Sequence, residues 1–225
     1  MPDTPIKSTL RTLPVLTGPF PNTSSNPDEF PPTPQETFQT WLSHAISSQI
    51  PEPHTMTAST TDEHNYPDAR VLILKNLDER GWHFAAKGGS PKARQPHGNR
   101  NMALTFYWPG VGRQVRVRGR VVVLGEEECG EDFGERSLGS RVSAMASVQS
   151  RVLEDREVLV RRAAEVEEAM ASGKEDEVSM PEWKVYAVDP VAVEFWQGSS
   201  DRLHQRLQYV RKADCAGWVK ELLWP

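Results

Sequence analysis

An alternating stretch in the middle of the chain limits the possible folds more than any other feature. It runs from Arg113 to Leu124, with Gln114 and three arginines on every second position and valines or a glycine between them. Successive side chains of an extended strand point to opposite faces, so the pattern predicts a strand with one buried and one exposed face. Such half-buried strands are typical of antiparallel sheets.

Further segments combine β-branched or aromatic residues with turn residues on both sides. They predict strands over Thr57–Thr61, Ala69–Leu74, Trp82–Ala86, Met102–Trp108, Trp183–Val188, Val191–Trp196, Arg202–Val210 and Trp218–Leu223. Short strands that follow one another with turn spacing favour a closed or sandwiched antiparallel sheet over a doubly wound parallel one. The expected fold class is therefore α+β, mainly antiparallel.

Two regions predict helices. Thr33 precedes Pro34, and Glu36 lies three residues after Thr33, which is the arrangement of a capped helix start. This helix is expected to end before Pro51. Between Gly130 and Met170 apolar residues recur at three- and four-residue steps among charged ones, which predicts a long outer helix with a solvated face.

Length, charge and composition exclude several classes of protein. With 225 residues and a net charge of −5, the chain is expected to bind neither nucleic acid nor a membrane. Residues 1–34 are crowded with Pro, Thr, Ser and Asn and predict a flexible arm, followed by a single domain over residues 35–225.

The cysteines and histidines give no sign of a disulfide framework or a metal centre. Cys129 and Cys215 are the only cysteines, which fits a reducing compartment, and we interpret both as structural or incidental thiols. No zinc-binding spacing occurs among the six histidines, so no metal is expected. Neither a signal peptide nor a membrane-spanning run is recognised, and the expected location is the cytoplasm.

A group of cationic residues near the C-terminus suggests a ligand site. If the segment is extended, Arg202, His204 and Arg206 share one face, and Trp196 lies shortly before them. This row favours an anionic, planar ligand, although an ordinary exposed strand would show the same pattern.

Other basic residues lie at strand edges or in loops, namely Arg70, Lys75, Lys92 and Arg136. A phosphate dianion held away from water needs several such cations together with hydroxyl or amide donors. Ser90, Ser140 and Ser150 could supply hydroxyls. From its residues alone, the chain is thus interpreted as a mostly antiparallel domain that binds a phosphate-bearing ligand.

Five blocks of sequence, in order and at similar spacing, resemble the pyridoxamine 5′-phosphate oxidase family. They are Arg70–Lys75, Gly89–Lys92, Arg113–Val117, Ser140–Ser150 and Glu194–Arg206. The resemblance covers roughly Phe38 to Pro225. It implies a split β-barrel of the FMN-binding type with flanking helices, and a homodimer that binds FMN at the subunit interface. A C-terminal region of about residues 181–225 would serve dimerisation and substrate binding.

The resemblance also assigns roles to individual residues. FMN would be held by Arg70, Val71, Leu72, Lys75, Ser90, Lys92, Gln114, Gln149, Ser150, Trp196 and Arg206. Substrate would be held by Lys75, Arg136, Ser140, Arg202 and His204, with Arg202 and His204 as the catalytic pair. Arg70 and Lys75 are an odd number of residues apart, so both can face one site only if the strand bulges, ends or lies between two ligands.

The implied reaction is oxidation of pyridoxamine 5′-phosphate, or pyridoxine 5′-phosphate, to pyridoxal 5′-phosphate, with hydride transfer to the flavin and reduction of O₂ to H₂O₂. Two alternatives stay open. One is a related FMN-dependent oxidase with another substrate, such as a phenazine-type dihydro-aromatic compound. The other is a non-catalytic protein that binds flavin or pyridoxal phosphate.

Several positions depart from the family pattern. Pro91 replaces an arginine, which removes a charge-assisted bond to the flavin phosphate and predicts weaker FMN binding. Asp132 replaces a tyrosine and would repel a substrate phosphate unless it turns away and Phe133 fills the space. Ala85 and Lys184 also depart from the pattern, which leaves the choice of substrate open.

Overall fold

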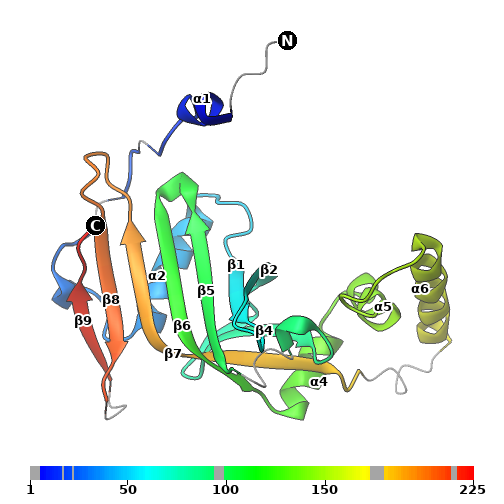
Figure 1. Cartoon of the computed structure of the whole chain (residues 1–225). Helices are drawn as coiled ribbons and strands as arrows, with labels where there is room; N and C mark the ends of the chain where they lie inside the picture. Colours follow the sequence, from blue (N-terminus) through cyan, green and yellow to red (C-terminus); the bar gives the residue numbers. More distant parts are fainter. Residues whose placement is uncertain (1–5, 17, 22, 94–98, 173–179, 214–216) are drawn as a thin grey trace. The chain divides into compact units, whose positions relative to one another are not determined.

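The computed structural model of the chain describes residues 6–16, 18–21, 23–93, 99–172, 180–213 and 217–225. Within these residues the strands are β1 (Thr55–Thr61), β2 (Pro67–Ile73), β3 (Asn76–Asp78), β4 (Gly81–Lys87), β5 (Asn101–Trp108), β6 (Arg113–Val123), β7 (Trp183–Gln197), β8 (Gln205–Arg211) and β9 (Trp218–Leu222). The α-helices are α1 (Ile6–Arg11), α2 (Pro34–Ser47), α4 (Glu126–Gly134), α5 (Leu138–Ala146) and α6 (Arg156–Ala171). Figure 1 shows these elements along the chain.

The strands form a mainly antiparallel sheet. Its hydrogen-bonded order is β2-β1-β5-β6-β7-β4-β3, and β8 pairs with both β7 and β9. Pairs β1–β2, β1–β5, β3–β4, β4–β7 and β8–β9 are all antiparallel. The expectation of a mainly antiparallel sheet is confirmed.

The chain divides into two compact units. The first unit contains Met1–Pro53, Phe106–Arg116 and Val193–Pro225, and the second contains His54–Thr105 and Val117–Ala192. Strands β5, β6 and β7 contribute residues to both units.

Helix α2 supplies the core of the first unit. Its start carries the capping box that the sequence predicts, because the Thr33 hydroxyl accepts from the Glu36 amide and the Glu36 carboxylate accepts from the Thr33 amide. The apolar stripe of α2 buries Phe38 against Phe106, with ring centroids 4.7 Å apart, and Trp41 against Phe195, at 5.2 Å. Burial of these rings holds α2 on the sheet.

Removing the cap should measurably destabilise this helix. We expect Thr33→Ala to lower the free energy of unfolding by about 1 kcal/mol, since the Glu36 amide loses its acceptor, the Thr33 hydroxyl. Thr40→Ala is the matched control, because Thr40 is exposed in the middle of α2 and alanine is a better helix former. Urea unfolding at one protein concentration measures both, and an equal loss in the two variants would contradict a capping role.

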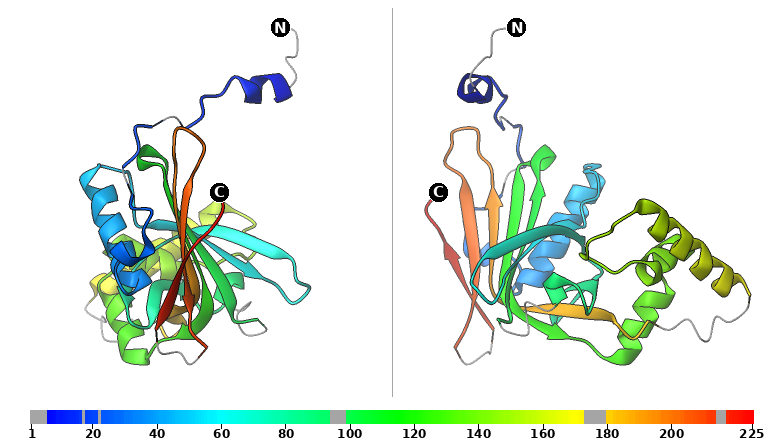
Figure 2. Two further views of the ribbon diagram at one scale, coloured as in Figure 1. Left: turned by 90° about the vertical axis from the view of Figure 1, so that its left-hand side faces the viewer. Right: turned by 45° about the vertical axis from the view of Figure 1, so that its right-hand side comes forward.

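The second unit is built on β4. Trp82 and Phe84 are fully buried there, and the Phe84 ring stacks on Tyr186 of β7 with centroids 5.2 Å apart. Helices α5 and α6 pack against each other (Figure 2). A small cluster of Phe133, Ala144 and Trp183 joins α4, α5 and β7.

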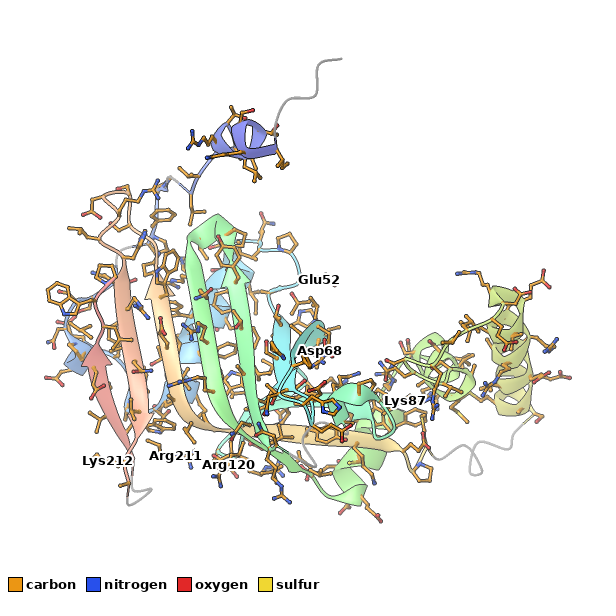
Figure 3. All side chains as sticks on the ribbon, in the orientation of Figure 1. Glu52, Asp68, Lys87, Arg120, Arg211 and Lys212 are labelled. Carbon is orange, nitrogen blue, oxygen red and sulfur yellow. The ribbon has the colours of Figure 1, made fainter. Side chains whose placement is uncertain are left out.

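The alternation in β6 is confirmed. Val115, Val117 and Val121 are buried, whereas the three arginines between them are exposed, including Arg120, which Figure 3 labels. The apolar stripe predicted along α6 is also confirmed. Met170 is buried, and Leu159, Ala163 and Val166 are half-buried.

Two sequence predictions about secondary structure are wrong, and one strand was not predicted. One long helix is expected before Met170, but the segment forms α4, α5 and α6, because Ser137 and Asp155 cap new helices with their side chains. Two strands are expected between Trp183 and Trp196, but β7 is continuous through Pro190. The short strand β3 is not anticipated, since three residues carry too little pattern.

Parts of the N-terminal segment contact β8 and β9 within the first unit. Helix α1 and a 3₁₀ turn, Pro27–Glu29, lie in it, and the carbonyls of Phe30 and Pro31 accept from Lys220 and from the Tyr209 hydroxyl, both at 2.9 Å. The boundary at residue 34 stays a prediction. Cys215, interpreted above as a structural or incidental thiol, lies outside the described residues.

Candidate functional site

The second unit contains a cavity of about 610 Å³. This volume is in the range of small-molecule sites. Five residues that the sequence assigns to FMN or substrate line it, namely Leu72, Lys92, Arg136, Gln149 and Ser150. Three further cations, Lys87, Arg151 and Arg162, also line it, against a single carboxylate, Glu154. The lining therefore favours an anionic ligand.

Lys92 is the most buried of the predicted cations, with 7% of its surface exposed. Burial lowers the pKa of its ammonium group, and the positive charge of Arg70 lowers it further. Arg70 is oriented by Thr60 Oγ1 at 2.7 Å, by the carbonyl of Ala58 at 3.2 Å and by an ion pair with Asp68. An anion bound beside Lys92 and Arg70 would stabilise the positive charges of both.

Four further residues assigned to FMN differ in how accessible they are to a ligand, namely Ser90, Gln149, Ser150 and Val71. Ser90 is fully buried, and its Oγ donates to the carbonyl of Lys87 at 2.7 Å, so this hydroxyl stabilises the turn after β4. Gln149 and Ser150 are exposed in the segment after α5, and Ser150 has a φ of 65°. Val71, on β2, is 68% exposed.

Lys75 lies beyond the end of β2, which stops at Ile73. Strand alternation therefore does not assign Lys75 to the face opposite Arg70. The Lys75 amide donates to the carbonyl of His83 at 2.9 Å, and its Nζ lies 2.9 Å from Asp132 Oδ1. The ammonium group is thus positioned and partly neutralised by a carboxylate.

Asp132 also bonds a buried indole. Trp183 Nε1 donates to Asp132 Oδ2 at 2.8 Å, and only 12% of the Asp132 side chain is exposed. Phe133 is buried with its ring 5.8 Å from Trp183. From the sequence, Asp132 would not repel a substrate phosphate under two conditions: Asp132 turns away, and Phe133 fills the space. Phe133 packs beside Trp183. The Asp132 carboxylate is bound to Lys75 and Trp183.

Arg136 completes this group of side chains. Its guanidinium carbon lies 4.2 Å above the centre of the Trp183 ring, and Nη2 donates to the carbonyl of Ser140 at 3.3 Å. Its Nε is buried without a hydrogen-bond partner among the described residues. Burial lowers the pKa of Arg136, and the charge of Asp132 opposes this. The Ser140 hydroxyl accepts from Ser137 Oγ at 2.9 Å.

Sequence reasoning missed Lys87 and Arg162 as lining residues. Lys87, labelled in Figure 3, is 8% exposed and donates to the carbonyls of Ala144, at 2.7 Å, and Ser147 at the C-terminal end of α5. Burial lowers its pKa, Glu182 opposes this, and Arg162 adds to it. Lys87 borders a predicted turn, and this position could have indicated a ligand contact. The sequence pattern around Arg162 indicates only one charge of a solvated helix face.

In the first unit, the predicted common face of Arg202, His204 and Arg206 is wrong. Strand β8 begins only at Gln205, and Arg202 has a left-handed φ of 70°, so period-two alternation does not apply to Arg202 or His204. The Arg202 amide donates to the carbonyl of Ser199 at 3.1 Å. Arg202 therefore belongs to a turn in which its side chain is exposed.

His204, in the same turn, is held by one contact within the turn and one with Trp196 of β7. Its Nδ1 accepts from the Ser199 amide at 3.0 Å, and its ring centroid lies 4.8 Å from that of Trp196. Because Nδ1 accepts, the proton of a neutral imidazole is assigned to Nε2. The turn thus presents a ring nitrogen that donates.

Arg206 is bound to a buried carboxylate. Its Nε donates to Glu194 Oε1 at 2.9 Å, its Nη1 donates to the carbonyl of Trp224 at 2.7 Å, and Arg116 reaches the other Glu194 oxygen at 3.2 Å. Two of the five N–H donors of Arg206 are therefore used within the first unit. Gln114, on β6, is half-buried.

A buried pair that the sequence did not signal supports the turn. Arg113 Nε donates to Gln197 Oε1 at 2.8 Å, and Gln197 Nε2 donates to the carbonyls of Val111 and Gly112. Burial lowers the pKa of Arg113 to about 10, and its guanidinium carbon lies 4.2 Å above the Trp41 ring. These contacts hold the end of β7, from which the turn with Arg202 and His204 departs.

The predicted residues are divided between the two units. The second unit holds Arg70, Val71, Leu72, Lys75, Ser90, Lys92, Arg136, Ser140, Gln149 and Ser150, and the first unit holds Gln114, Trp196, Arg202, His204 and Arg206. Over the described ranges, no group of three or more His, Cys, Asp or Glu side chains could hold a metal ion. None of the helices described is long and apolar enough to cross a bilayer.

Comparison with known proteins identifies relatives over most of the chain. The pyridoxamine 5′-phosphate oxidase family model matches residues 42–170, and the model of the pyridoxine 5′-phosphate oxidase C-terminal dimerisation region matches residues 183–225. A pyridoxine/pyridoxamine 5′-phosphate oxidase of Burkholderia thailandensis is 44% identical over 188 residues, or 83% of this chain and 86% of that protein. One from Burkholderia mallei is 44% identical over 195 residues, or 86% and 90%.

Comparison with solved structures identifies the same family. PhzG from Burkholderia lata, in complex with tetrahydrophenazine-1-carboxylic acid, matches with a TM-score of 0.83 and 30% identity over 92% of this chain and 100% of that one. A pyridoxamine 5′-phosphate oxidase-related FMN-binding protein from Nostoc punctiforme matches with a TM-score of 0.67 and 16% identity over 87% and 100%. The expected fold class, an α+β split β-barrel with flanking helices, is confirmed. The chain therefore belongs to the pyridoxamine 5′-phosphate oxidase family, a family of FMN-dependent oxidoreductases.

Proposed function

We propose that the protein is an FMN-dependent oxidase that converts pyridoxamine 5′-phosphate, or pyridoxine 5′-phosphate, to pyridoxal 5′-phosphate while O₂ is reduced to H₂O₂. The observation that carries the proposal is the cation-lined cavity of the second unit, in a chain 44% identical to oxidases of that name. The cavity suits a ligand with a phosphate group, since Lys87, Lys92 and Arg136 are buried or half-buried cations in its lining.

The residues of the second unit fit FMN. Lys92 and Arg70 are a buried or half-buried cation pair that a flavin phosphate would stabilise, with Gln149 and Ser150 as further donors. When bound, FMN would accept a hydride and pass the electrons to O₂. The remaining FMN contacts are proposed for Val71, Leu72, Lys75, Ser90, Gln114, Trp196 and Arg206.

The substrate phosphate is proposed to bind Lys75, Arg136 and Ser140, which lie in one group around Trp183 and Asp132. Arg202 and His204 then position the pyridine ring and the reacting carbon. His204 suits this role because the Ser199 amide and the Trp196 ring fix its orientation and assign a donating proton to Nε2.

Assembly as a homodimer with FMN at the interface is part of the proposal. Its support is the match of residues 183–225 to a family dimerisation region and the exposure of large apolar side chains in the second unit. Val71 is 68% exposed, Ile73 48% and Val152 93%. Apolar surface of this kind is typical of protein interfaces. Within this proposal residues 1–34 act as an arm, residues 35–225 form the FMN-binding domain, and the protein works in the cytoplasm.

A second candidate is an FMN-dependent oxidase of a phenazine-type dihydro-aromatic compound. It is supported by the match to PhzG in complex with tetrahydrophenazine-1-carboxylic acid. Asp132 supports it too, because this carboxylate pairs with Lys75, a cation proposed to bind the substrate phosphate.

Anaerobic reduction tests the proposal. The purified protein should show a visible flavin band, and pyridoxamine 5′-phosphate should bleach it in the absence of O₂, with H₂O₂ released when air is admitted. Bleaching by a dihydrophenazine carboxylate, but not by pyridoxamine 5′-phosphate, would support the second candidate. A yellow protein that neither compound reduces would instead be a non-catalytic binding protein.

A further inference from the structure

The proposed substrate-phosphate group contains a carboxylate that none of the assigned roles uses. Asp132 lies 2.9 Å from Lys75 Nζ and accepts from Trp183 Nε1 at 2.8 Å. Arg136 lies over the same Trp183 ring. The side chains of Lys75, Asp132, Trp183 and Arg136 therefore form one cluster, all within the second unit.

The cluster carries less positive charge than its two cations suggest. Lys75 and Arg136 contribute one positive charge each, and the Asp132 carboxylate removes one, which leaves one net positive charge. A phosphate monoester is a dianion above about pH 6, whereas a carboxylate or a sulfate ester is a monoanion. A monoanion would be neutralised by the cluster, while a dianion would leave an excess negative charge close to Asp132.

Asp132 is also held in place. Its side chain is 12% exposed, and each of its oxygens has a partner, Lys75 for Oδ1 and Trp183 for Oδ2. Turning the carboxylate away would break an ion pair and leave the indole N–H without this acceptor, which is costly in a buried place. The carboxylate therefore stays where its charge acts on any anion bound by Lys75 and Arg136.

We infer that Asp132 is a specificity-determining residue that shifts the substrate site from dianionic towards monoanionic ligands. This inference rests on the proposed function, since it takes Lys75 and Arg136 as the residues that hold the substrate anion. The energy of an ion in a given electrostatic potential scales with its charge. Removing the Asp132 charge should thus help a dianion twice as much, on a logarithmic scale, as a monoanion, and should not affect a neutral ligand.

Three unreactive ligands of one shape separate these cases. They are 4-deoxypyridoxine 5′-phosphate as the dianion, its 5′-sulfate as the monoanion and 4-deoxypyridoxine without an ester group. All lack the group that would be oxidised. For the FMN-loaded protein at pH 8, we expect Asp132→Asn to tighten binding of the phosphate about tenfold and of the sulfate about threefold. Binding of the free alcohol should stay unchanged.

The controls keep the test decisive. Glu131→Gln removes the same charge from the neighbouring, exposed residue of α4 and should change none of the three affinities by more than about twofold. Asp132→Ser is a second neutral variant in case Asp132→Asn does not fold, and it should give the same graded response. Visible spectra and near-UV circular dichroism check that both variants keep FMN and native packing.

The failure of this inference can be told apart from failure of the proposed function. If the wild-type protein oxidises pyridoxamine 5′-phosphate but the three affinities change equally or not at all, Asp132 only supports its neighbours and the inference is wrong. If the graded response is found while no pyridine substrate is oxidised, the proposed reaction is wrong and the inference stands. Failure of all three ligands to bind the wild-type protein would overturn both.

Discussion

Arg202→Ala is expected to slow anaerobic flavin reduction by about 10²–10³-fold while FMN affinity changes by less than about threefold. The location of Arg202 is the reason for this expectation. Arg202 lies in the turn before β8, where its amide is bound by Ser199 and its side chain is exposed, so the guanidinium is available to a ligand. In the proposed function it orients the substrate ring, and loss of orientation acts on the reaction rate.

Stopped-flow absorbance of the flavin band under anaerobic conditions measures the rate, and fluorescence titration of the apoprotein with FMN measures the affinity. Arg202→Gly is a second variant that removes the side chain, and glycine readily adopts the φ of 70° found at Arg202. Both variants should be equally slow if the side chain matters. A glycine variant as fast as the wild-type protein, or equal losses of rate and FMN affinity in both variants, would contradict a substrate role.

Gly119→Ala is expected to lower the free energy of unfolding by about 3 kcal/mol or more. Gly119 is buried in β6 next to β7, and a Cβ atom there would lie 2.1 Å from the carbonyl oxygen of Asp189 and 2.9 Å from Pro190 Cα. Both atoms belong to the backbone, so no side chain can move aside. The two strands would have to separate, which would break the sheet pairing in the second unit.

Gly130→Ala provides the comparison for this prediction. Gly130 is exposed within α4 and has no heavy atom within 4 Å of the position of an added Cβ, so alanine there should stabilise the helix by up to about 1 kcal/mol. Urea unfolding is measured at one protein concentration, since association would add to the stability. A loss below about 1 kcal/mol for Gly119→Ala would show that β6 and β7 do not approach as closely as described.

Local signals in the sequence predicted several elements well. The start of α2 depends on neighbours within one turn, Thr33 and Glu36, and its capping box is found as expected. The alternation in β6 depends only on the period of an extended strand. The strand pattern failed where a turn interrupts it. Arg202 looks like part of a strand, but the Ser199 carbonyl, three residues away, holds it in a turn.

By itself, the sequence determined the mainly antiparallel fold, the family and the identity of the candidate site residues. The fold class follows from periodicity, and the family and the candidate residues follow from the order and spacing of sequence blocks. Both kinds of signal are present in the linear sequence. The tertiary structure alone decided what each charge faces. Lys75 meets Asp132 from α4, Arg206 meets Glu194 from β7, and Lys87 meets the end of α5. Such pairings depend on segments far apart in the chain coming within a few ångströms, a distance that no local pattern records.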